Sequence, residues 1–318
     1  MIEVCVVGEI NLDLIMYGLP KDLVVDRELL AKNMAFTLGS SSAIFAHNLC
    51  TLGTKVGFVS KVGKDPLGKM AVERLAAAGV DTAHIKQGTG ETSTGLTVVL
   101  PHTQHRYILT YPGTMFEMQY SDIDTSYLRT ARHLHLSSFY LHRALRPRIV
   151  DLYRQAKEAG LTTSLDTNDD PENRWEQDLH QVLKYVDVFL PNDREAKKIA
   201  HTEDLSHALN LLAGLAKVVV VKRGSGSAIC RSGDEQWSLG PPKVQPVDDV
   251  GAGDTFDAGF IHLFLRGAKL EDCLAFANLT AAYSVTKEGG TEAFRDRNSL
   301  LRFLSQQWTL LGRGPFPA

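Results

Sequence analysis

The sequence predicts an α/β fold in three layers, in which helices cover both faces of a mostly parallel sheet, together with a small second sheet. Three observations support this. Strand-like apolar runs alternate with helix-like segments along the 318 residues, an order typical of parallel sheets with crossover helices. Several of these runs are apolar throughout, as in strands covered on both faces. Two pairs of shorter runs break the alternation and predict the second sheet.

We expect the strands of the main sheet at 4–7, 56–60, 133–136, 163–165, 186–190 and 218–222. The segments between them carry helix start signals and helical periodicity, at 66–78, 147–159, 193–200, 205–215 and 254–265. The small sheet is expected from 12–17, 35–38, 94–100 and 107–111, with a turn at 101–105. Because no repeat or low-complexity linker divides the chain, residues 1–318 are predicted to form a single domain.

Composition and charge narrow the classes of partner. The net charge of −3, without a basic block, argues against nucleic acid or an anionic membrane as the main partner. The four cysteines are far apart and lack Cys-x-x-Cys spacing, which indicates neither a zinc site nor a disulfide framework. The first residues lack a basic leader, and no apolar run reaches the roughly 20 residues of a membrane span. We therefore expect a cytoplasmic protein that acts on small molecules.

The most informative stretch is Gly251-Ala252-Gly253-Asp254, which precedes an apolar, helix-like run. A loop without bulky side chains leaves its backbone N–H groups free to face a ligand, and the helix N-terminus adds the positive end of a dipole. Asp254 can accept the proton of a hydroxyl while the N–H groups of Gly251, Ala252 and Gly253 stabilise a transferring phosphoryl group. An aspartate in a first helical turn can also serve only as a cap, so these four residues alone leave both interpretations open.

The longer pattern Asp-x-x-Gly-Ala-Gly-Asp-Thr-Phe-x-Ala-Gly-Phe, from Asp248 to Phe260, resembles the C-terminal signature of the ribokinase-like (PfkB) family of carbohydrate kinases. Four separated motifs occur in the order of the family, so that the resemblance covers nearly the whole chain. It implies the three-layer fold with a β-sheet lid over a sugar site, ATP with Mg²⁺ as phosphoryl donor, and Asp254 as catalytic base. Asp249 departs from the pattern, since the family usually has Thr or Ser there.

Candidate sugar-binding residues follow the first strand, at the edge where open α/β sheets bind ligands. Asn11 and Asp13 lie there. Taken alone, Asp13 is better explained as a turn residue, whereas the resemblance implies that it hydrogen-bonds sugar hydroxyls. The resemblance adds a loop and helix start at Gly39, Ser40, Ser41 and Ala43. Ser40 replaces a second glycine, and Ile44 replaces the asparagine that contacts the sugar, with Asn48 one helical turn later as a candidate substitute.

Candidate nucleotide-binding residues follow two later strands. Asn192 and Glu195 fit a capping box, and by resemblance they also fit the Asn-x-x-Glu motif that organises magnesium-bound water and the triphosphate. The resemblance assigns a nucleotide cradle to a turn, at Lys222, Gly224, Ser225, Gly226 and Ser227. Asn278 corresponds to an asparagine near the adenine, with a structural role in its helix as the alternative. Residues 63–70 nearly match a phosphate-binding loop, but Met70 lacks the hydroxyl that binds magnesium.

The resemblance also implies a monovalent cation, K⁺ in this reading, and a partner subunit. The cation would be enclosed by two loops that contain Asp248, Val250, Ser284, Lys287 and Gly289. Exposed lid strands make a homodimer through the lid plausible, because unpaired edges and apolar lid faces favour pairing.

The sequence is accordingly identified as that of an ATP-dependent sugar kinase, acting on a hydroxyl, expected to be primary, of a sugar such as ribose, fructose or a 2-keto-3-deoxy sugar acid. A nucleoside kinase of the same family and a noncatalytic sugar- or nucleotide-binding protein on the same fold remain as alternatives. A dinucleotide-dependent oxidoreductase is disfavoured, because residues 224–229 lack the third glycine of the dinucleotide-binding fingerprint.

Overall fold

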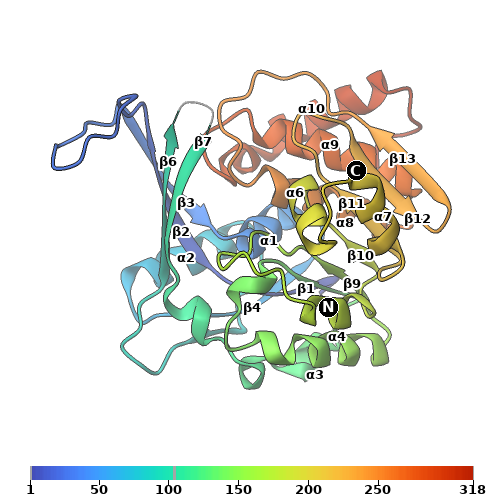
Figure 1. Ribbon diagram of the computed structural model, residues 1–318, viewed down its shortest axis with the longest axis horizontal. Coiled ribbons are helices and arrows are strands. Elements are labelled where there is room, and N and C mark those ends of the chain that lie inside the picture. The colour runs from blue at the N-terminus through green and yellow to red at the C-terminus, as the bar shows by residue number, and fades with distance from the viewer. Residues whose placement is uncertain (1, 103–104, 318) are drawn as a thin grey trace.

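The computed structural model describes residues 2–102 and 105–317, and within them the chain forms two separate β-sheets (Figure 1). The larger sheet has the strand order β13-β12-β11-β10-β9-β8-β1-β4-β5. Neighbours from β5 to β11 pair in parallel, whereas β12 and β13 add an antiparallel edge. The strands are β1 (Val4–Val7), β4 (Val56–Val62), β5 (Ile85–Gln87), β8 (His133–Leu136), β9 (Thr162–Leu165), β10 (Val188–Phe189), β11 (Val218–Val221), β12 (Ala228–Ser232) and β13 (Glu235–Leu239). The predicted mostly parallel sheet is confirmed.

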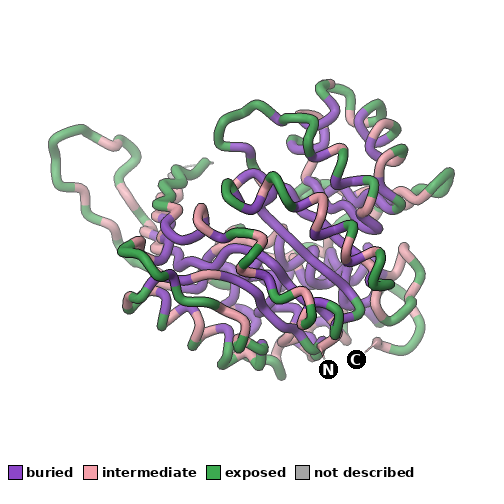
Figure 2. The backbone as a smooth tube through the Cα atoms, turned by 90° about the horizontal axis from the view of Figure 1, so that it is seen from below, coloured by how far each residue is buried: buried purple, intermediate pink, exposed green. Residues whose placement is uncertain are grey.

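Helices pack on both faces of this sheet and bury it (Figure 2). They are α1 (Ser41–Thr51), α2 (Pro66–Ala77), α3 (Thr125–Leu128), α4 (Ile149–Glu158), α5 (Asp178–Leu183), α6 (Asp193–Ile199), α7 (Leu205–Ala213), α8 (Ala252–Phe264), α9 (Leu270–Ser284) and α10 (Arg297–Leu310). Successive strand side chains point to opposite faces. Val4 and Val6 therefore join the core formed with α1, α2, α8, α9 and α10, whereas Cys5 and Val7 join the core formed with α3 to α7.

The second sheet is the lid, with strand order β3-β2-β6-β7, and it lies to one side of the main sheet (Figure 1). Its strands are β2 (Asn11–Tyr17), β3 (Asn33–Gly39), β6 (Gly95–His102) and β7 (His105–Tyr111). Every residue of the edge strand β7 is exposed. The segment 18–32 between β2 and β3 projects from the molecule as a mostly exposed arm (Figures 1 and 2). All four predicted lid strands are confirmed, each slightly longer than expected.

Two boundaries matter for the site. Helix α8 begins at Ala252, earlier than the predicted residue 254, because Gly251 ends the preceding loop in a left-handed conformation. Strand β10 is confined to Val188–Phe189 instead of 186–190. The predicted turn at 101–105 includes Thr103 and Gln104, which lie outside the described residues. Among the helices of the described ranges, none combines the length and the apolar character needed to cross a membrane.

Candidate active site

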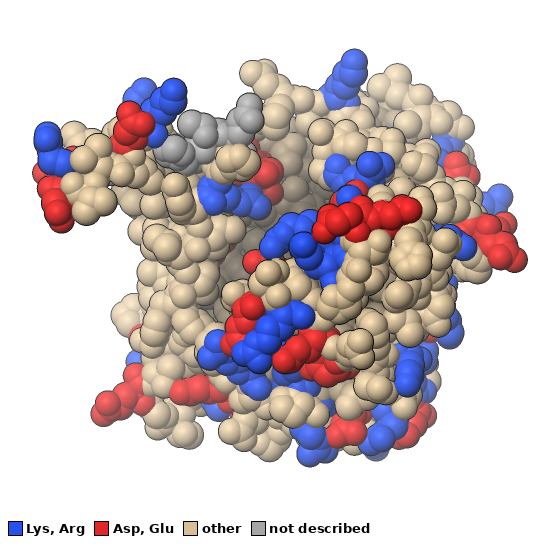
Figure 3. Space-filling model, viewed as in Figure 1, with Lys and Arg blue, Asp and Glu red and all other residues tan. Residues whose placement is uncertain are grey.

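The candidate site lies at the carboxyl ends of the parallel strands, facing the lid sheet (Figure 1). Polar residues follow these strands closely, with Glu9 after β1, Asp166 after β9, Asn192 after β10 and Lys222 after β11. Ligands of open α/β sheets bind at this edge. The space-filling view shows a cleft between the lid and the rest of the molecule, with acidic and basic side chains along its margin (Figure 3).

Helix α8 starts at the predicted anion-binding loop. Gly251 has φ 73°, in the region that favours glycine, so that the chain can turn sharply into the helix. The backbone N–H of Ala252 donates to the carbonyl of Asp249 at 3.2 Å. This bond competes with the predicted role of Ala252 as a phosphoryl donor, whereas that role stays a prediction for Gly251 and Gly253.

Asp254 lies in the first turn of α8 and is only 7% exposed. Burial and the nearby carboxylate of Asp166 raise its pKa to about 7, while the ammonium of Lys222 and a hydrogen bond with Ser41 act in the opposite direction. A carboxylate with a pKa near neutrality is suited to accept and release a proton. The predicted catalytic base therefore has both a sheltered position and a matched proton affinity.

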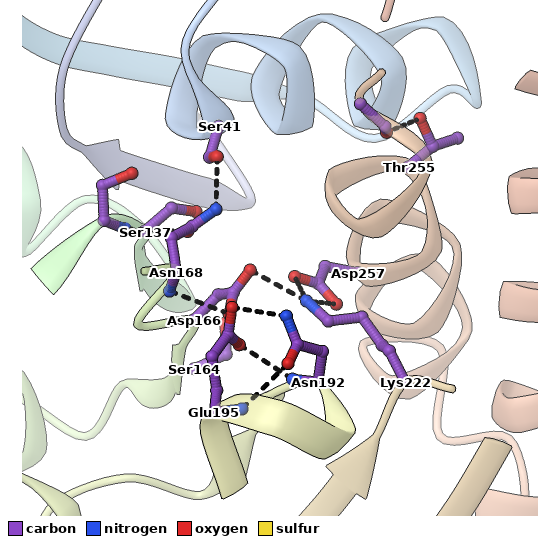
Figure 4. Close-up of polar contacts among 12 residues, drawn as sticks. Ser41, Ser137, Ser164, Asp166, Asn168, Asn192, Glu195, Lys222, Thr255 and Asp257 are labelled. Atoms are coloured by element: carbon purple, nitrogen blue, oxygen red, sulfur yellow. Dashed lines mark hydrogen bonds and ion pairs between the residues drawn. The ribbon is translucent and has the colours of Figure 1, made fainter. Parts of the chain in front are cut away.

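A buried cluster of Asp166, Lys222 and Asp257 lies beside this base (Figure 4). The ammonium Nζ of Lys222 is 2.8 Å from Asp166 Oδ2 and 2.9 Å from Asp257 Oδ2. Although burial disfavours a charged ammonium, the two carboxylates raise the pKa of Lys222. Lys222 was predicted to bind the nucleotide, but its ammonium is held by these carboxylates in the structure.

Asp166 and Asp257 were missed by the sequence analysis. Asp166 directly follows the predicted strand 163–165, and Asp257 lies three residues after Asp254, on a neighbouring position of the same helix. Both signals were present, but neither indicates which cation the carboxylates would meet.

Asn192 and Glu195 form the predicted capping box at the start of α6 (Figure 4). The side chain of Asn192 accepts from the N–H of Glu195 at 2.9 Å, and Glu195 Oε2 accepts from the N–H of Asn192 at 2.8 Å. Burial, followed by the charge of Asp166, raises the pKa of Glu195 to about 8. Both residues thus have a structural role, and their predicted link to magnesium is not excluded by it.

An open pocket of about 430 Å³ lies next to this helix start. It is lined by Asn192, Asp193, Arg194, Lys222, Arg223 and Gly224. Of the predicted nucleotide cradle, Lys222 and Gly224 thus line the pocket, and Gly224, Ser225 and Gly226 are exposed, whereas Ser227 is half-buried. Asn278 Nδ2 donates to the carbonyl of Leu239 at 2.9 Å, a bond that fixes α9 to β13 and gives this side chain a structural role.

At the acceptor end, Asn11, Asp13 and Gly39 are brought together by the pairing of β2 with β3. A side chain at position 39 would collide with Asp13, since a Cβ built there lies 2.1 Å from Asp13 Oδ1. The buried Oδ1 of Asn11 has no hydrogen-bond partner among the described residues. Burial, the charge of Asp254 and that of Asp248 raise the pKa of Asp13 to about 7. These groups offer acceptors for hydroxyl donors in a confined space.

Hydrogen bonds to Glu9 fix the start of α1. Ser40, where the family usually has glycine, adopts φ 62°, and its Oγ donates to the carbonyl of Glu9 at 2.8 Å. Ser42 donates to the carboxylate of Glu9 through its Oγ at 2.6 Å and its N–H at 3.1 Å. Ser41 Oγ accepts from Asn168 Nδ2 at 2.7 Å. Ala43 is fully buried in the hydrophobic core, so its predicted contact with substrate is replaced by packing.

Ile44, which replaces the usual asparagine, and Asn48, its candidate substitute, are both engaged in packing α1 against its neighbours. Ile44 packs against the loops at Gly251 and Gly290, where added side chains would approach it within 3.1 and 2.6 Å. Asn48 is fully buried, and its Nδ2 donates to Thr255 Oγ1 at 2.8 Å and to the Gly290 carbonyl at 3.0 Å. Asn48 therefore ties α1 to α8 and does not substitute for the missing asparagine.

The loops predicted to enclose a monovalent cation lie together. The carboxylate of Asp248 accepts from the N–H of Val250 at 3.0 Å and that of Gly289 at 2.9 Å, and it also accepts from Tyr17 on the lid at 2.6 Å. Ser284 Oγ donates within its own helix to the carbonyl of Ala281. Lys287 lines a different cavity, of about 510 Å³, behind lid strand β3.

The family is decided by a match over almost the entire chain. A family model described as pfkB family carbohydrate kinase matches residues 1–297. The chain belongs to the PfkB family of carbohydrate kinases. This kinase therefore catalyses phosphoryl transfer to an alcohol group and binds ATP.

Individual relatives agree with this assignment. The kinase is 29% identical over 312 residues to an ATP-dependent ribose-1-phosphate kinase of Halopiger xanaduensis, covering 97% of this chain and 100% of that one. It is 28% identical over 244 residues to an uncharacterized sugar kinase of Archaeoglobus fulgidus, covering 77% of this chain and 96% of the relative. A solved ribokinase II of Escherichia coli, in complex with ATP and Mg²⁺, superposes with a TM-score of 0.81 at 25% identity, covering 96% of this chain and all of that one.

Proposed function

We propose that this PfkB kinase transfers the γ-phosphoryl group of ATP to a primary hydroxyl of a small sugar, with Asp254 as the general base. The observation that carries the proposal is the state of Asp254, which is buried in the first turn of α8 with a pKa of about 7, beside Asp13. A base of this kind can take the hydroxyl proton at neutral pH as the oxygen attacks phosphorus. The N–H groups of Gly251 and Gly253 would stabilise the negative charge that develops on the phosphoryl oxygens.

The sugar would bind between the main sheet and the lid. Asp13 and Asn11 present oxygen acceptors to its hydroxyl groups, and Gly39 gives the sugar close access to both side chains. Ser40 and Ser41 lie at the start of α1 on the same side. Movement of the lid onto this site would exclude water and limit hydrolysis of ATP, so we propose that residues 1–318 work as one kinase domain with a lid.

The nucleotide would occupy the pocket beside α6 and the β11–β12 turn. Gly224, Ser225, Gly226 and Ser227 supply exposed backbone for the phosphates, and Asn278 lies on the adjacent α9. Asn192 and Glu195 would meet a magnesium ion only through water, because their side-chain oxygens already accept the hydrogen bonds of the capping box. Magnesium bound with ATP would neutralise phosphate charge.

A monovalent cation such as K⁺ fits the loops around Asp248 only through backbone carbonyl groups. Both carboxylate oxygens of Asp248 already accept hydrogen bonds, so that the side chain shapes the loop. We include Val250, Ser284, Lys287 and Gly289 in this proposed enclosure because their loops lie together. Potassium dependence of turnover, with sodium as the comparison, tests this part of the proposal.

The lid also supports a homodimer. Ile108, Leu109 and Tyr111 on the edge strand β7 are each more than half exposed, and apolar edge strands that face solvent favour association. Light scattering of the purified protein tests this. The four free cysteines are compatible with a reducing cytoplasm, which we propose as the compartment.

The deciding experiment measures ADP release from Mg-ATP with pentoses, hexoses, keto-deoxy sugar acids and nucleosides, for the wild type and Asp254→Asn. We expect turnover with a sugar and a loss of at least about a thousandfold in Asp254→Asn, because the variant cannot accept the proton. Asp234→Asn, an exposed carboxylate in the turn between β12 and β13, is the matched control and should retain wild-type activity. Binding of a sugar without any transfer would favour a noncatalytic binding protein, and turnover restricted to nucleosides would favour a nucleoside kinase.

A further inference from the structure

The acceptor end of the site carries a marked excess of carboxylates. The side chain of Asp13 is buried against Gly39 on the lid, and the negative charges of Asp254 and Asp248 both act on it. Asp249 is the next residue in the same loop, and its side chain is exposed. Three carboxyl groups, from β2, the loop before α8 and α8 itself, thus lie close enough to interact at the acceptor end, and a fourth, Asp249, belongs to the same loop.

The cations that act on these carboxylates are already paired. In the part of the chain that the structure describes, Arg106 on lid strand β7 acts on Asp13, and Lys222 acts on Asp254. The guanidinium Nη1 of Arg106 donates to Asp249 Oδ1. The ammonium of Lys222 is shared by Asp166 and Asp257. Each cation is therefore already paired with a carboxylate of the chain, and an incoming anion would have to compete for it.

This arrangement discriminates between acceptors by charge. An uncharged sugar brings hydroxyl donors, which ionised or neutral carboxyl groups can accept. A sugar acid or sugar phosphate brings a further negative charge into a partly buried field of the same sign, and it would have to compete with Asp249 for Arg106. Specificity of this kind depends on repulsion of the wrong substrate as much as on attraction of the right one.

We propose that the acceptor is an uncharged sugar and that Asp249, by holding Arg106, is the residue that excludes anionic sugars. The inference rests on the proposed sugar kinase function and narrows its substrate class. Arg106 lies on the lid, and Asp249 lies two residues before Gly251, so the pair joins the lid to the loop in front of the catalytic helix. The side chain of Asp249 is 76% exposed, which leaves it replaceable without disturbing the core.

The test compares kcat/KM for uncharged and anionic acceptors with carbon skeletons of equal length, such as fructose with 2-keto-3-deoxygluconate and ribose with ribose 1-phosphate. Wild-type enzyme should favour the uncharged member of each pair by at least about tenfold. Asp249→Ser frees Arg106, and it should raise kcat/KM for the anionic member relative to the uncharged one by about tenfold, the effect of one charge-assisted hydrogen bond. The double variant Arg106→Gln with Asp249→Ser should lose this gain, because the cation is gone. Asp234→Ser removes an exposed carboxylate elsewhere and should leave the selectivity unchanged.

The outcomes separate the two levels of the proposal. A wild-type preference for sugar acids or sugar phosphates would overturn the uncharged-acceptor inference while leaving the kinase function intact. Unchanged selectivity in Asp249→Ser, with turnover retained, would overturn the role of the ion pair. Lack of transfer to every acceptor, by an enzyme that still binds ATP, would count against the proposed sugar kinase function itself. Added salt should weaken the discrimination, because the charges at the rim are screened.

Discussion

The phosphoryl-transfer end and the acceptor end of the site are built differently. At the phosphoryl end, Lys222 is 9% exposed and Asp257 is fully buried, and hydrogen bonds from three elements fix the charges. At the acceptor end, the Arg106–Asp249 pair lies at the rim and strand β7 is exposed along its length. Charges that stabilise a transition state act best when they are positioned beforehand. An exposed lid, in contrast, can change its side chains at little cost in stability.

The sequence motifs follow the same division. The Gly-Ala-Gly-Asp stretch is intact at the phosphoryl end, where only Ser227 in the nucleotide turn replaces a usual glycine. Ser40, Ile44 and Asp249 depart from the family at or near the acceptor end. From this comparison we propose that the reaction and the choice of sugar are carried by separate parts of this chain. Four predictions would sharpen or break that separation.

The largest expected effect is that of Lys222→Met. Removal of one partner from a buried ion cluster leaves Asp166 and Asp257 without their cation, which typically costs about 3–5 kcal/mol. We expect a loss of this order in the free energy of unfolding, measured by urea denaturation. Lys64→Met, at an exposed position, is the control and should change it by less than about 0.5 kcal/mol. A small effect at position 222 would show that the cluster is not a fixed part of the phosphoryl end.

Asp254→Asn should stabilise the folded protein at high pH. The folded-state pKa of Asp254, about 7, lies above its ordinary value of 3.8, so the folded state holds a proton that the unfolded chain releases. Stability is therefore lost as pH rises from about 4 through 7, and the asparagine variant avoids that loss. We expect a gain of roughly 2 kcal/mol at pH 8 and much less at pH 4, measured by denaturation at both values. An equal effect at both pH values would contradict the raised pKa.

Asn192→Ala should lower the stability of the protein and also weaken its binding of Mg-ATP. Loss of the cap of α6 costs about 1 kcal/mol of stability. Asp204→Ala removes a comparable cap from α7, where Asp204 accepts from the N–H of Ser206 at 2.8 Å, away from the pocket. We expect similar losses of melting temperature in both variants, but a raised KM for Mg-ATP only in Asn192→Ala. A raised KM for Mg-ATP in both variants would show that Asn192 acts only as a helix cap.

The smallest expected effect concerns Ser41→Ala. Ser41 Oγ accepts a hydrogen bond from Asn168, which leaves the hydroxyl proton of Ser41 free to be donated to Asp254. This bond lowers the pKa of Asp254. The variant should shift the acidic limb of the kcat/KM profile upward by about half a pH unit, which corresponds to about 0.7 kcal/mol. Wild-type activity should itself fall below pH 7, since Asp254 must be ionised to accept a proton. An unchanged pH profile would show that Ser41 does not affect the pKa of Asp254, and would leave only its proposed contact with the sugar.

Much of the fold was predictable, because most strands of the two sheets and most of the helices between them have local signals. The apolar runs of β1 and β11 indicated strands covered on both faces, and both faces are covered. The start of α8 was misplaced because a glycine in the left-handed region has no distinct sequence signal. Helices α9 and α10 were not predicted as elements, although α9 packs along α8.

The site was predictable where one stretch carries the chemistry and not where partners meet through the fold. Asp254 and the Asn192–Glu195 pair are local patterns, and the structure has Asp254 in the first turn of α8 and the pair at the start of α6. Lys222 and Asp166 are separated by more than fifty residues, and Glu9 reaches α1 across the whole of β2 and β3. Ile44 and Asn48 show most clearly what a sequence cannot predict. Only the packing of α1 on α8 reveals that both side chains contact neighbouring helices and loops and not the sugar site.

The position of β1 in the main sheet has a consequence for how the active enzyme is made. Val4 pairs with Val56 on one side and with His133 on the other, so the first strand is completed only after more than a third of the chain is available. Parallel pairings over such distances close large loops and form slowly. In the sheet, the segments that carry the site flank β1 on both sides, and in the sequence they extend from Asn11 to Asn278. The site therefore cannot assemble before the sheet does. Recovery of phosphotransfer after dilution from denaturant should therefore lag behind the return of helical circular dichroism.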